Sequence, residues 1–139
     1  MTLLSLWNAI RAKLFPKVHS YAFKKNVLPV MRSMAFQTHP KEAFGVLRGR
    51  HKGRTLVVRD IAYQPFLNTP MNAHIALDPY VLPDMVGTFH SHPSTNPLPS
   101  AADKRLFAKH PGVHCIIAYP YKTVHVYNSS GEPIGLHKL

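Results

Sequence analysis

The stretch Gly87-Thr88-Phe89-His90-Ser91-His92-Pro93 places two imidazoles two positions apart in the chain. If this stretch is a β-strand, His90 and His92 share one face, because side chains along a strand alternate with period two. Two imidazoles in that arrangement can bind the same divalent ion. The prolines at 93 and 99 bound a loop, after which Ser100 is expected to start a helix.

The first turn of this helix carries a carboxylate, Asp103. With His90 and His92, it gives two nitrogen ligands and one oxygen ligand. A fourth position is left for water, which is typical of a catalytic rather than a structural zinc site. Ser100 and Asp103 also fit a capping box, in which both side chains satisfy free N–H groups at the helix start. At this point the sequence leaves both interpretations open.

A candidate acid–base residue lies far away in sequence, at Glu42. The chain contains only two glutamates, and the other, Glu132, sits in a turn-like segment. Glu42 lies between a helix-like stretch and the apolar run that follows it. An unpaired carboxylate is costly at the edge of a buried strand. Glu42 therefore either has a partner, takes part in chemistry, or is a surface residue at the strand entrance.

Together these motifs resemble the JAMM, or MPN+, metalloprotease family. The resemblance rests on Pro-x-Glu-x-x-Gly-x-Leu-x-Gly at residues 40–49 and on His-Ser-His-Pro, six residues, then Ser-x-x-Asp at residues 90–103. It extends from about Asn26 to the C-terminus. It implies an α/β fold, with a single mixed β-sheet flanked by helices. The family contains zinc isopeptidases that remove ubiquitin or ubiquitin-like proteins, and small prokaryotic relatives that process such modifiers and sulfur carriers. Members lacking the ligands serve as scaffolds.

The resemblance implies a role for each matching residue. His90, His92 and Asp103 would bind Zn²⁺, Glu42 would act as general base and acid, and Ser100 would hydrogen-bond the oxyanion. The expected function is hydrolysis of the peptide or isopeptide bond at the C-terminus of a ubiquitin-like modifier by metal-activated water. Two alternatives remain: a non-catalytic scaffold or nucleic-acid-associated module, and a zinc hydrolase of a small-molecule or peptide adduct.

The charge and the cysteine content limit which binding partners and which cellular location are expected. Seventeen basic residues against six acidic ones give a formal charge of +11 and a pI near 10.1, which attracts polyanions. The basic residues are scattered, without an RNA-binding aromatic signature or a zinc finger. We therefore favour an acidic modifier or its conjugates as partner and predict no specific nucleic acid. The lone Cys115 excludes an internal disulfide and fits a buried strand and a cytoplasmic location.

The N-terminal segment is expected to be an amphipathic helix over residues 2–15, ended by Pro16. Leu3, Trp7, Ile10 and Leu14 recur at helical spacing on one face. No signal peptide or transmembrane run is evident. We expect an extension at residues 1–17 and a JAMM/MPN+-like catalytic domain at residues 18–139. The extension has three interpretations: packing on the domain's own surface, self-association, or shallow docking on a membrane.

The remaining elements follow from periodicity and turn residues. Helices are predicted at 26–38 and 100–110, and a loop at 67–71. Strands are predicted at 19–23, 43–48, 55–63, 73–77, 85–91, 113–119, 123–127 and 134–139, the last paired through the Ser130-Gly131 turn. Other histidines are not expected to bind metal: His39 belongs to a loop that can line the cleft, and core or edge packing accounts for His74, His114 and His125.

Overall fold

The computed structural model of the chain describes residues 2–14, 17–63, 84–135 and 137–138. Its helices are α1 (Leu3–Leu14), α2 (Val27–Thr38) and α4 (Ala101–Lys109). Its strands are β1 (Ser20–Phe23), β2 (Phe44–Lys52), β3 (Thr55–Tyr63), β4 (Met85–His92), β5 (Val113–Ala118), β6 (Val124–Tyr127) and β7 (His137–Lys138). The predicted loop at 67–71 and strand at 73–77 lie outside the described residues.

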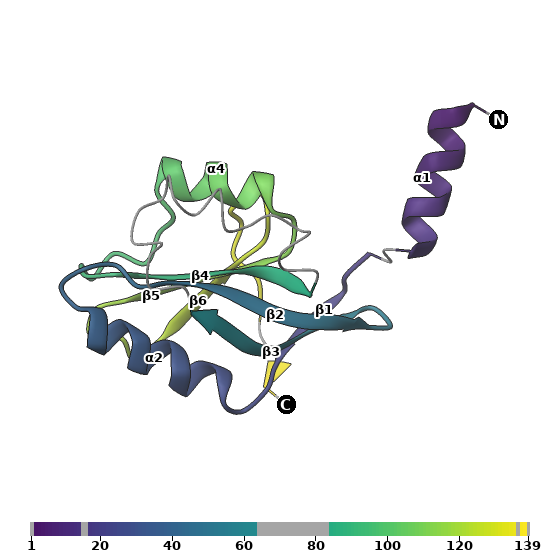
Figure 1. Cartoon of the computed structure of the whole chain (residues 1–139). Coiled ribbons are helices and arrows are strands. Elements are labelled where there is room, and N and C mark those ends of the chain that lie inside the picture. Colours follow the sequence, from purple (N-terminus) through teal and green to yellow (C-terminus); the bar gives the residue numbers. More distant parts are fainter. Residues whose placement is uncertain (1, 15–16, 64–83, 136, 139) are drawn as a thin grey trace.

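The strands form one mixed sheet in the order β6-β5-β4-β2-β3-β1-β7. β2 and β3 make an antiparallel hairpin, while β4 pairs antiparallel with β2 and parallel with β5. The hairpin turns at Gly53, whose φ of 61° favours glycine. Figure 1 shows α2 against one face of this sheet and α4 against the other. The predicted fold class, a single mixed sheet flanked by helices with an N-terminal helix, is confirmed.

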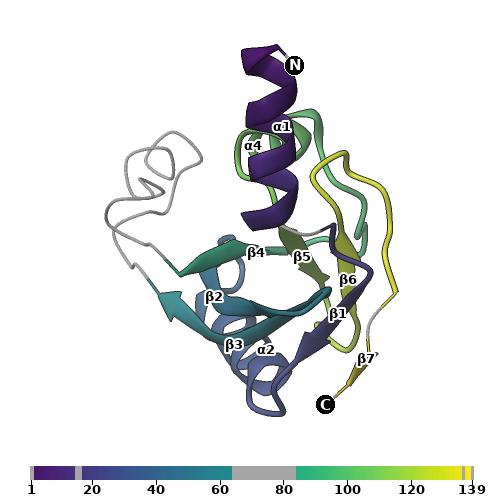
Figure 2. The same cartoon turned by 90° about the vertical axis from the view of Figure 1, so that its right-hand side faces the viewer.

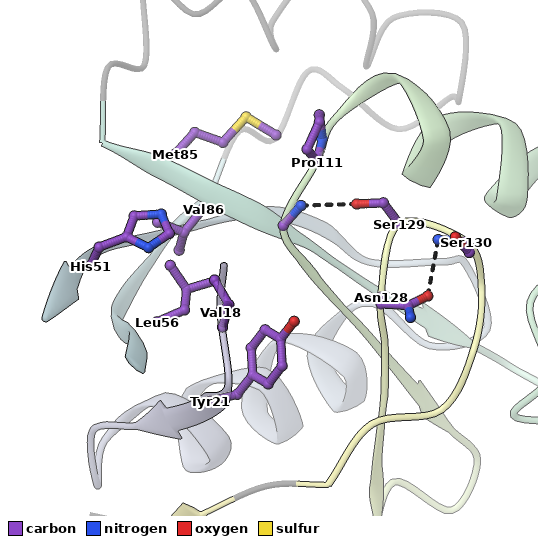
Figure 3. Close-up of a pocket in the computed structure, with 11 residues that line it drawn as sticks. Val18, Tyr21, His51, Leu56, Met85, Val86, Pro111, Asn128, Ser129 and Ser130 are labelled. Atoms are coloured by element: carbon purple, nitrogen blue, oxygen red, sulfur yellow. Dashed lines mark hydrogen bonds between the residues drawn. The ribbon is translucent and has the colours of Figure 1, made fainter. Parts of the chain in front are cut away.

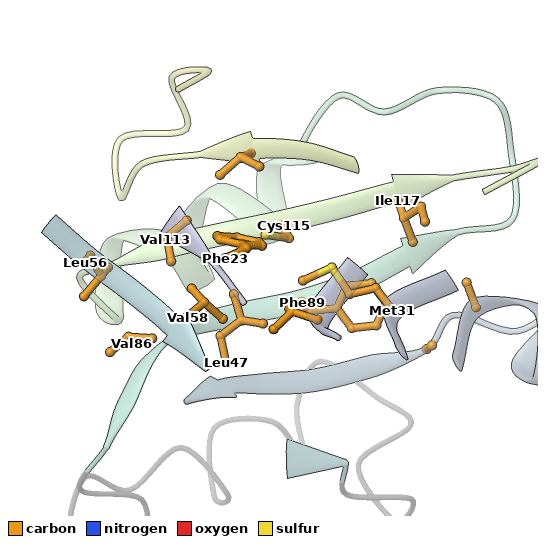
Figure 4. Packing of buried hydrophobic residues seen from close by; sticks show 14 of the residues in the cluster. Phe23, Met31, Leu47, Leu56, Val58, Val86, Phe89, Val113, Cys115 and Ile117 are labelled. Atoms are coloured by element: carbon orange, nitrogen blue, oxygen red, sulfur yellow. The ribbon is translucent and has the colours of Figure 1, made fainter. Parts of the chain in front are cut away.

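Apolar side chains fill the space between α2 and the sheet and form the main hydrophobic core (Figure 4). Met31 of α2 packs with Leu47, Phe89 and Cys115, which come from β2, β4 and β5 respectively and are fully buried. Burial raises the pKa of the Cys115 thiol, because a thiolate there would have no water around it. The thiol is therefore a core group, as the sequence predicts.

The face covered by α4 is partly polar. Leu106 of α4 packs on Val46, and Phe107 packs on Ile116 and Tyr127. Between these apolar contacts lie buried polar side chains, those of Thr88, His90 and His114. The same β4 strand therefore supplies apolar residues to one face and polar residues to the other.

Strand β2 is longer than the predicted 43–48. The pairing of β2 with β3 shifts register between Arg48 and Gly49 and then continues to Lys52. At Gly49 a Cβ atom would collide with the backbone carbonyl oxygen of Val57. A glycine at this irregularity lets the two backbones approach and the strand continue, which the apolar pattern alone does not reveal.

The predicted pairing of the last strand through the turn holds only at the start of that strand. The turn at 130–131 does return the chain to β6, since the Ile134 N–H donates to the Val126 carbonyl at 2.9 Å. Beyond that point β7 pairs in parallel with β1 instead, with Ala22 opposite His137 (Figure 2). An edge strand such as β1 has unpaired backbone groups, and the short β7 satisfies some of them.

Helix α1 forms as predicted and makes no extensive contact with another element (Figure 1). Its side chains from Thr2 to Ile10 are exposed. Among the described residues, no helix combines the length and the hydropathy that a membrane span requires.

Candidate metal centre

Two imidazoles converge at the end of β4. His90 and His92 lie on the sheet face that α4 covers, and their Nε2 atoms are 3.1 Å apart. His90 is buried, with 4% of its surface exposed, and His92 is partly buried. The strand alternation expected from the sequence therefore holds, and both rings present the same atom to one point.

The carboxylate of Asp103 meets the two imidazoles from the first turn of α4. Its Oδ1 lies 3.1 Å from His90 Nε2, and its Oδ2 lies 3.4 Å from His92 Nε2. A tetrahedral zinc with bonds of 2.0–2.1 Å needs ligand atoms about 3.3 Å from one another. The separations between these three side chains match that requirement, so the donor set and its spacing fit a zinc ion.

The ligands are held by further hydrogen bonds. His92 Nδ1 lies 2.8 Å from the Asn96 carbonyl oxygen. Because a carbonyl only accepts, Nδ1 carries the proton and Nε2 of the neutral ring keeps its lone pair for the metal. On the other side, the Ser100 N–H donates to Asp103 Oδ2 at 2.7 Å. Such contacts orient ligands and set their tautomer.

Ser100 and Asp103 form the capping box that the sequence allows. The Asp103 N–H donates to Ser100 Oγ at 3.1 Å, reciprocating the bond from Ser100 N–H. The cap uses the Ser100 hydroxyl as an acceptor, which leaves its proton able to point toward a substrate. Capping by Ser100 is therefore confirmed. Its predicted hydrogen bond to the oxyanion is compatible with this cap and remains a prediction.

The charges of the centre favour binding a cation. Burial by itself raises the pKa of the Asp103 carboxyl, but hydrogen bonds with His90 and His92 outweigh it and hold the pKa well below its usual range. The hydrogen bond with Asp103 raises the pKa of His92, against the opposing effect of burial. Asp103 is thus ionised at neutral pH, and in the metal-free protein its carboxylate faces the two imidazoles.

Glu42 reaches the centre through strand pairing. Phe44 of β2 lies opposite His90, in a register that continues to Ala43 and Ser91. Continued one step beyond the strand, this register would bring Glu42 opposite His92 on the same face of the sheet. Its carboxylate is close enough to add to the rise in the pKa of His92. Glu42 is exposed, so solvent reaches the proposed base.

A residue that the sequence reasoning missed, Ser91, fixes this approach. Its Oγ accepts from the Ala43 N–H at 2.8 Å, and its own N–H donates to the Ala43 carbonyl at 3.0 Å. Ser91 lies between His90 and His92 in the sequence, and its side chain is buried on the opposite face of the strand. It positions the backbone next to Glu42. The only signal in the sequence was a hydroxyl in the middle of an apolar strand.

A group of aromatic residues borders the centre. The Tyr119 N–H donates to the His92 carbonyl at 3.0 Å, and the Tyr119 ring stacks on His39 with centroids 5.1 Å apart. His39 Nδ1 also lies 2.7 Å from the Tyr121 hydroxyl. His39 is thus part of this border and not a fourth metal ligand. Sequence reasoning placed it near the cleft but did not identify its aromatic partners.

Two of the other histidines are placed by the structure. His114 is fully buried, and its ring nitrogens lie 2.7 Å from Thr88 Oγ1 and from the His110 carbonyl. It is a core residue, as predicted. His125 lies on β6, away from β4 in the sheet order, and is partly buried. His74 lies outside the described residues.

A cavity of about 570 Å³ lies at the opposite end of β4 (Figure 3). Met85 and Val86, at the start of the strand, line it together with Tyr21 and Leu56. At the rise of a β-strand, about 3.4 Å per residue, Met85 is roughly 17 Å from His90. The candidate metal ligands therefore do not belong to this cavity but lie at the other end of the strand, under α4.

The fold and the ligand set define a class: a mixed-sheet domain with an open two-histidine, one-aspartate metal site. Comparison with family models identifies the family within this class. Residues 24–129 match the model described as prokaryotic homologs of the JAB domain. The chain belongs to this family.

Solved structures agree with this assignment. A JAB1/MPN domain protein from Archaeoglobus fulgidus is 25% identical, with a TM-score of 0.66 over 87% of this chain and 98% of that one. A structure described as a metalloprotease-like JAMM zinc site in the proteasome and signalosome is 24% identical, with a TM-score of 0.63 over 88% and 99%. A protein from Desulfitobacterium hafniense is 24% identical, with a TM-score of 0.58 over 86% and 93%. None of the curated proteins matches the chain.

Proposed function

We propose that this chain is a zinc-dependent isopeptidase or peptidase that hydrolyses the bond at the C-terminus of a ubiquitin-like modifier. One observation carries the proposal. The ligand atoms of His90, His92 and Asp103 lie 3.1–3.4 Å from one another, and the carboxylate of Glu42 is near enough to help raise the pKa of His92. Likeness to a structure named for a metalloprotease-like zinc site supports it.

The residues of the chain divide the chemistry among them. Zinc in this position would supply Lewis-acid activation of water. Glu42 would accept a proton from the attacking water and deliver it to the leaving amine, which must be protonated to depart. The Ser100 hydroxyl would donate a hydrogen bond to the carbonyl oxygen as negative charge develops on it. Asp103, held by the Ser100 N–H, would stay in place through the reaction.

An acidic protein substrate matches the charge around the centre. Lys41 precedes Glu42, and Lys104 and Arg105 follow Asp103; all three are exposed. A positive field around a site raises the local concentration of an acidic partner and its rate of association. Changing Lys104 and Arg105 to glutamate should therefore raise KM for an acidic modifier at low salt and leave kcat nearly unchanged. We also place the reaction in the cytoplasm, which the single buried cysteine supports.

The two glutamates provide a matched test. The substrates are ubiquitin-like modifiers joined at their C-terminus to a reporter protein through a peptide or a lysine isopeptide bond. Zinc-loaded wild-type protein and Glu132→Gln should cleave at the modifier terminus. Glu42→Gln should bind the same amount of zinc and lose at least about 100-fold in rate, the contribution of a general base.

Three results would contradict the proposal. Equal cleavage by Glu42→Gln and wild type would exclude Glu42 as the base. Cleavage of cysteine adducts or short peptides without any cleavage of modifier fusions would favour a small-substrate hydrolase. Zinc binding without hydrolysis of either substrate class would favour a scaffold.

A further inference from the structure

Helix α1 displays large apolar side chains to solvent. Leu3, Leu4, Leu6, Trp7 and Ile10 are 87%, 69%, 45%, 63% and 43% exposed, respectively. We call these five residues the α1 apolar set. Figure 1 shows α1 projecting away from the sheet, and no other element packs extensively against it. Burying such a surface is favourable, so this helix needs a binding partner.

The charge of the surrounding chain identifies the kind of partner. Residues 1–18, which comprise α1 and the chain just after it, contain three basic residues (Arg11, Lys13 and Lys17) and no aspartate or glutamate. Among the described acidic residues, Asp60 and Asp84 are paired with Arg48 and Arg59, and the carboxylate of Asp103 faces the two imidazoles of the metal centre. An apolar helix is thus combined with positive charge and with no acidic residue in the same segment of the chain, which is the pattern of helices that bind anionic lipid surfaces.

A second copy of the chain is a poorer partner for this helix. Each copy carries a formal charge of +11, so two copies repel one another. α1 also has no carboxylate that could pair with Arg11 or Lys13 of another α1. An anionic bilayer accepts the apolar set and neutralises these cations together.

From these observations we infer that α1 docks in the plane of an anionic lipid bilayer and tethers the metal-binding domain to the membrane surface. The helix has 12 residues, fewer than the roughly 20 that a span requires. It therefore lies in the interface, with the apolar set toward the acyl chains. This inference is independent of the reaction that the metal centre performs.

The chain contains its own reporter of docking, because Trp7 is its only tryptophan. Trp7 is 63% exposed, so its fluorescence in buffer is that of a hydrated indole. Adding vesicles of phosphatidylcholine with 30% phosphatidylserine should shift its emission to the blue, and the protein should float with the vesicles. Pure phosphatidylcholine should bind at least about tenfold more weakly, and 0.5 M NaCl should reverse much of the binding.

Two variants of equal charge separate apolar docking from simple attraction. Ile10→Glu removes a member of the apolar set. Ser5→Glu adds the same charge at an exposed position that lies about 100° or more around the helix from every member of the set. We expect Ile10→Glu to lose at least tenfold in vesicle affinity and Ser5→Glu to lose less than threefold. Both should keep the wild-type melting temperature and zinc content, since α1 packs on no other element extensively.

Four outcomes would overturn this inference. They are the absence of a blue shift with anionic vesicles, equal binding to neutral vesicles, equal losses in Ile10→Glu and Ser5→Glu, and a blue shift that appears without lipid as light scattering reports a dimer. The last outcome would assign the apolar set to self-association instead.

Discussion

Two histidine-containing regions lie on the same face of the sheet, beneath opposite ends of α4. Under the helix C-terminus, the ring of His114 stacks on Phe107, and both its nitrogens have hydrogen-bond partners in the protein. Under the helix N-terminus, His90 and His92 turn Nε2 atoms toward each other and toward a carboxylate. In the first region the protein itself satisfies the hydrogen-bonding groups of the imidazole. In the second region three candidate ligand atoms surround one point, where a cation could bind.

This difference shows that burial alone does not distinguish a structural histidine from a metal-binding one. His114 and His90 are both almost fully buried. What separates them is the identity of their partners. The carbonyl of His110 and the hydroxyl of Thr88 satisfy a neutral ring, whereas two facing Nε2 atoms and an ionised Asp103 leave the second region with lone pairs directed at one point.

The largest expected effect is on zinc affinity. Asp103→Asn keeps an oxygen that can accept from the Ser100 N–H but removes the negative charge that the ion needs. Zinc affinity should fall by more than about 100-fold, as measured by competition with a chromophoric chelator. His114→Gln should bind zinc as wild type does. If Asp103→Asn bound zinc as tightly as wild type, the region of His90 and His92 would not differ from that of His114 in the way proposed.

The opposite pattern is expected for stability. His114→Ala leaves the Thr88 hydroxyl and the His110 carbonyl without their buried partner and opens a cavity against Phe107. The free energy of unfolding should fall by about 3 kcal/mol, as measured by urea denaturation of metal-free protein. His125→Ala, on the partly buried edge strand β6, should cost about 1 kcal/mol or less. A loss of zinc in His114→Ala without a loss of stability would reverse the assignment of the regions.

The two regions should also differ in pH dependence. Burial lowers the pKa of His114 to about 4, against 6.5 in an unfolded chain. Between pH 6.5 and 4 the unfolded state therefore binds a proton that the folded state does not, and stability falls as the pH is lowered. The loss approaches about 3 kcal/mol over this window.

The matched variant for this experiment is His114→Gln, which does not titrate. The unfolding free energy of metal-free wild type minus that of His114→Gln should decline from pH 7 to pH 4 and stay constant above pH 7. Contributions from Asp103 and His92 cancel in the difference. A difference that is flat with pH would show that His114 is not a neutral buried group.

The smallest expected effect on stability tests the dual role of Ser100. Ser100→Ala removes the cap and the hydroxyl, and should cost about 1 kcal/mol of stability. Ser100→Gly keeps a good N-cap residue and should cost only a few tenths of a kcal/mol. Both should keep zinc and cleave more slowly than wild type, by about 100-fold, if the hydroxyl stabilises the oxyanion. A wild-type rate in Ser100→Gly would leave capping as its only role.

Sequence reasoning predicted the local elements well, because local patterns determine them. The strand at 55–63 has the predicted bounds, and the helix at 101–109 begins at the predicted cap. His90 and His92 share a face because period-two alternation needs no tertiary information. The helix start places Asp103 in the first turn for the same kind of reason.

What depends on pairing between distant strands was not derivable from spacing. The approach of Glu42 to His92 depends on the β2–β4 register and on the Ser91 contacts, and only the family resemblance anticipated it. The parallel pairing of β7 with β1 was missed, because a strand's partner depends on which sheet edge is open. The two hydrogen bonds of the His114 ring could likewise be predicted only from the three-dimensional positions of Thr88 and His110.

The most direct test of the metal centre is X-ray absorption at the zinc edge of stoichiometrically loaded protein. We predict four light ligands at about 2.0–2.1 Å, two of them imidazoles. His92→Ala should lose one imidazole contribution, and His125→Ala should leave the spectrum unchanged. A sulfur ligand, more than two imidazoles, or an unaltered spectrum in His92→Ala would contradict the central claim that His90, His92 and Asp103 together hold the ion.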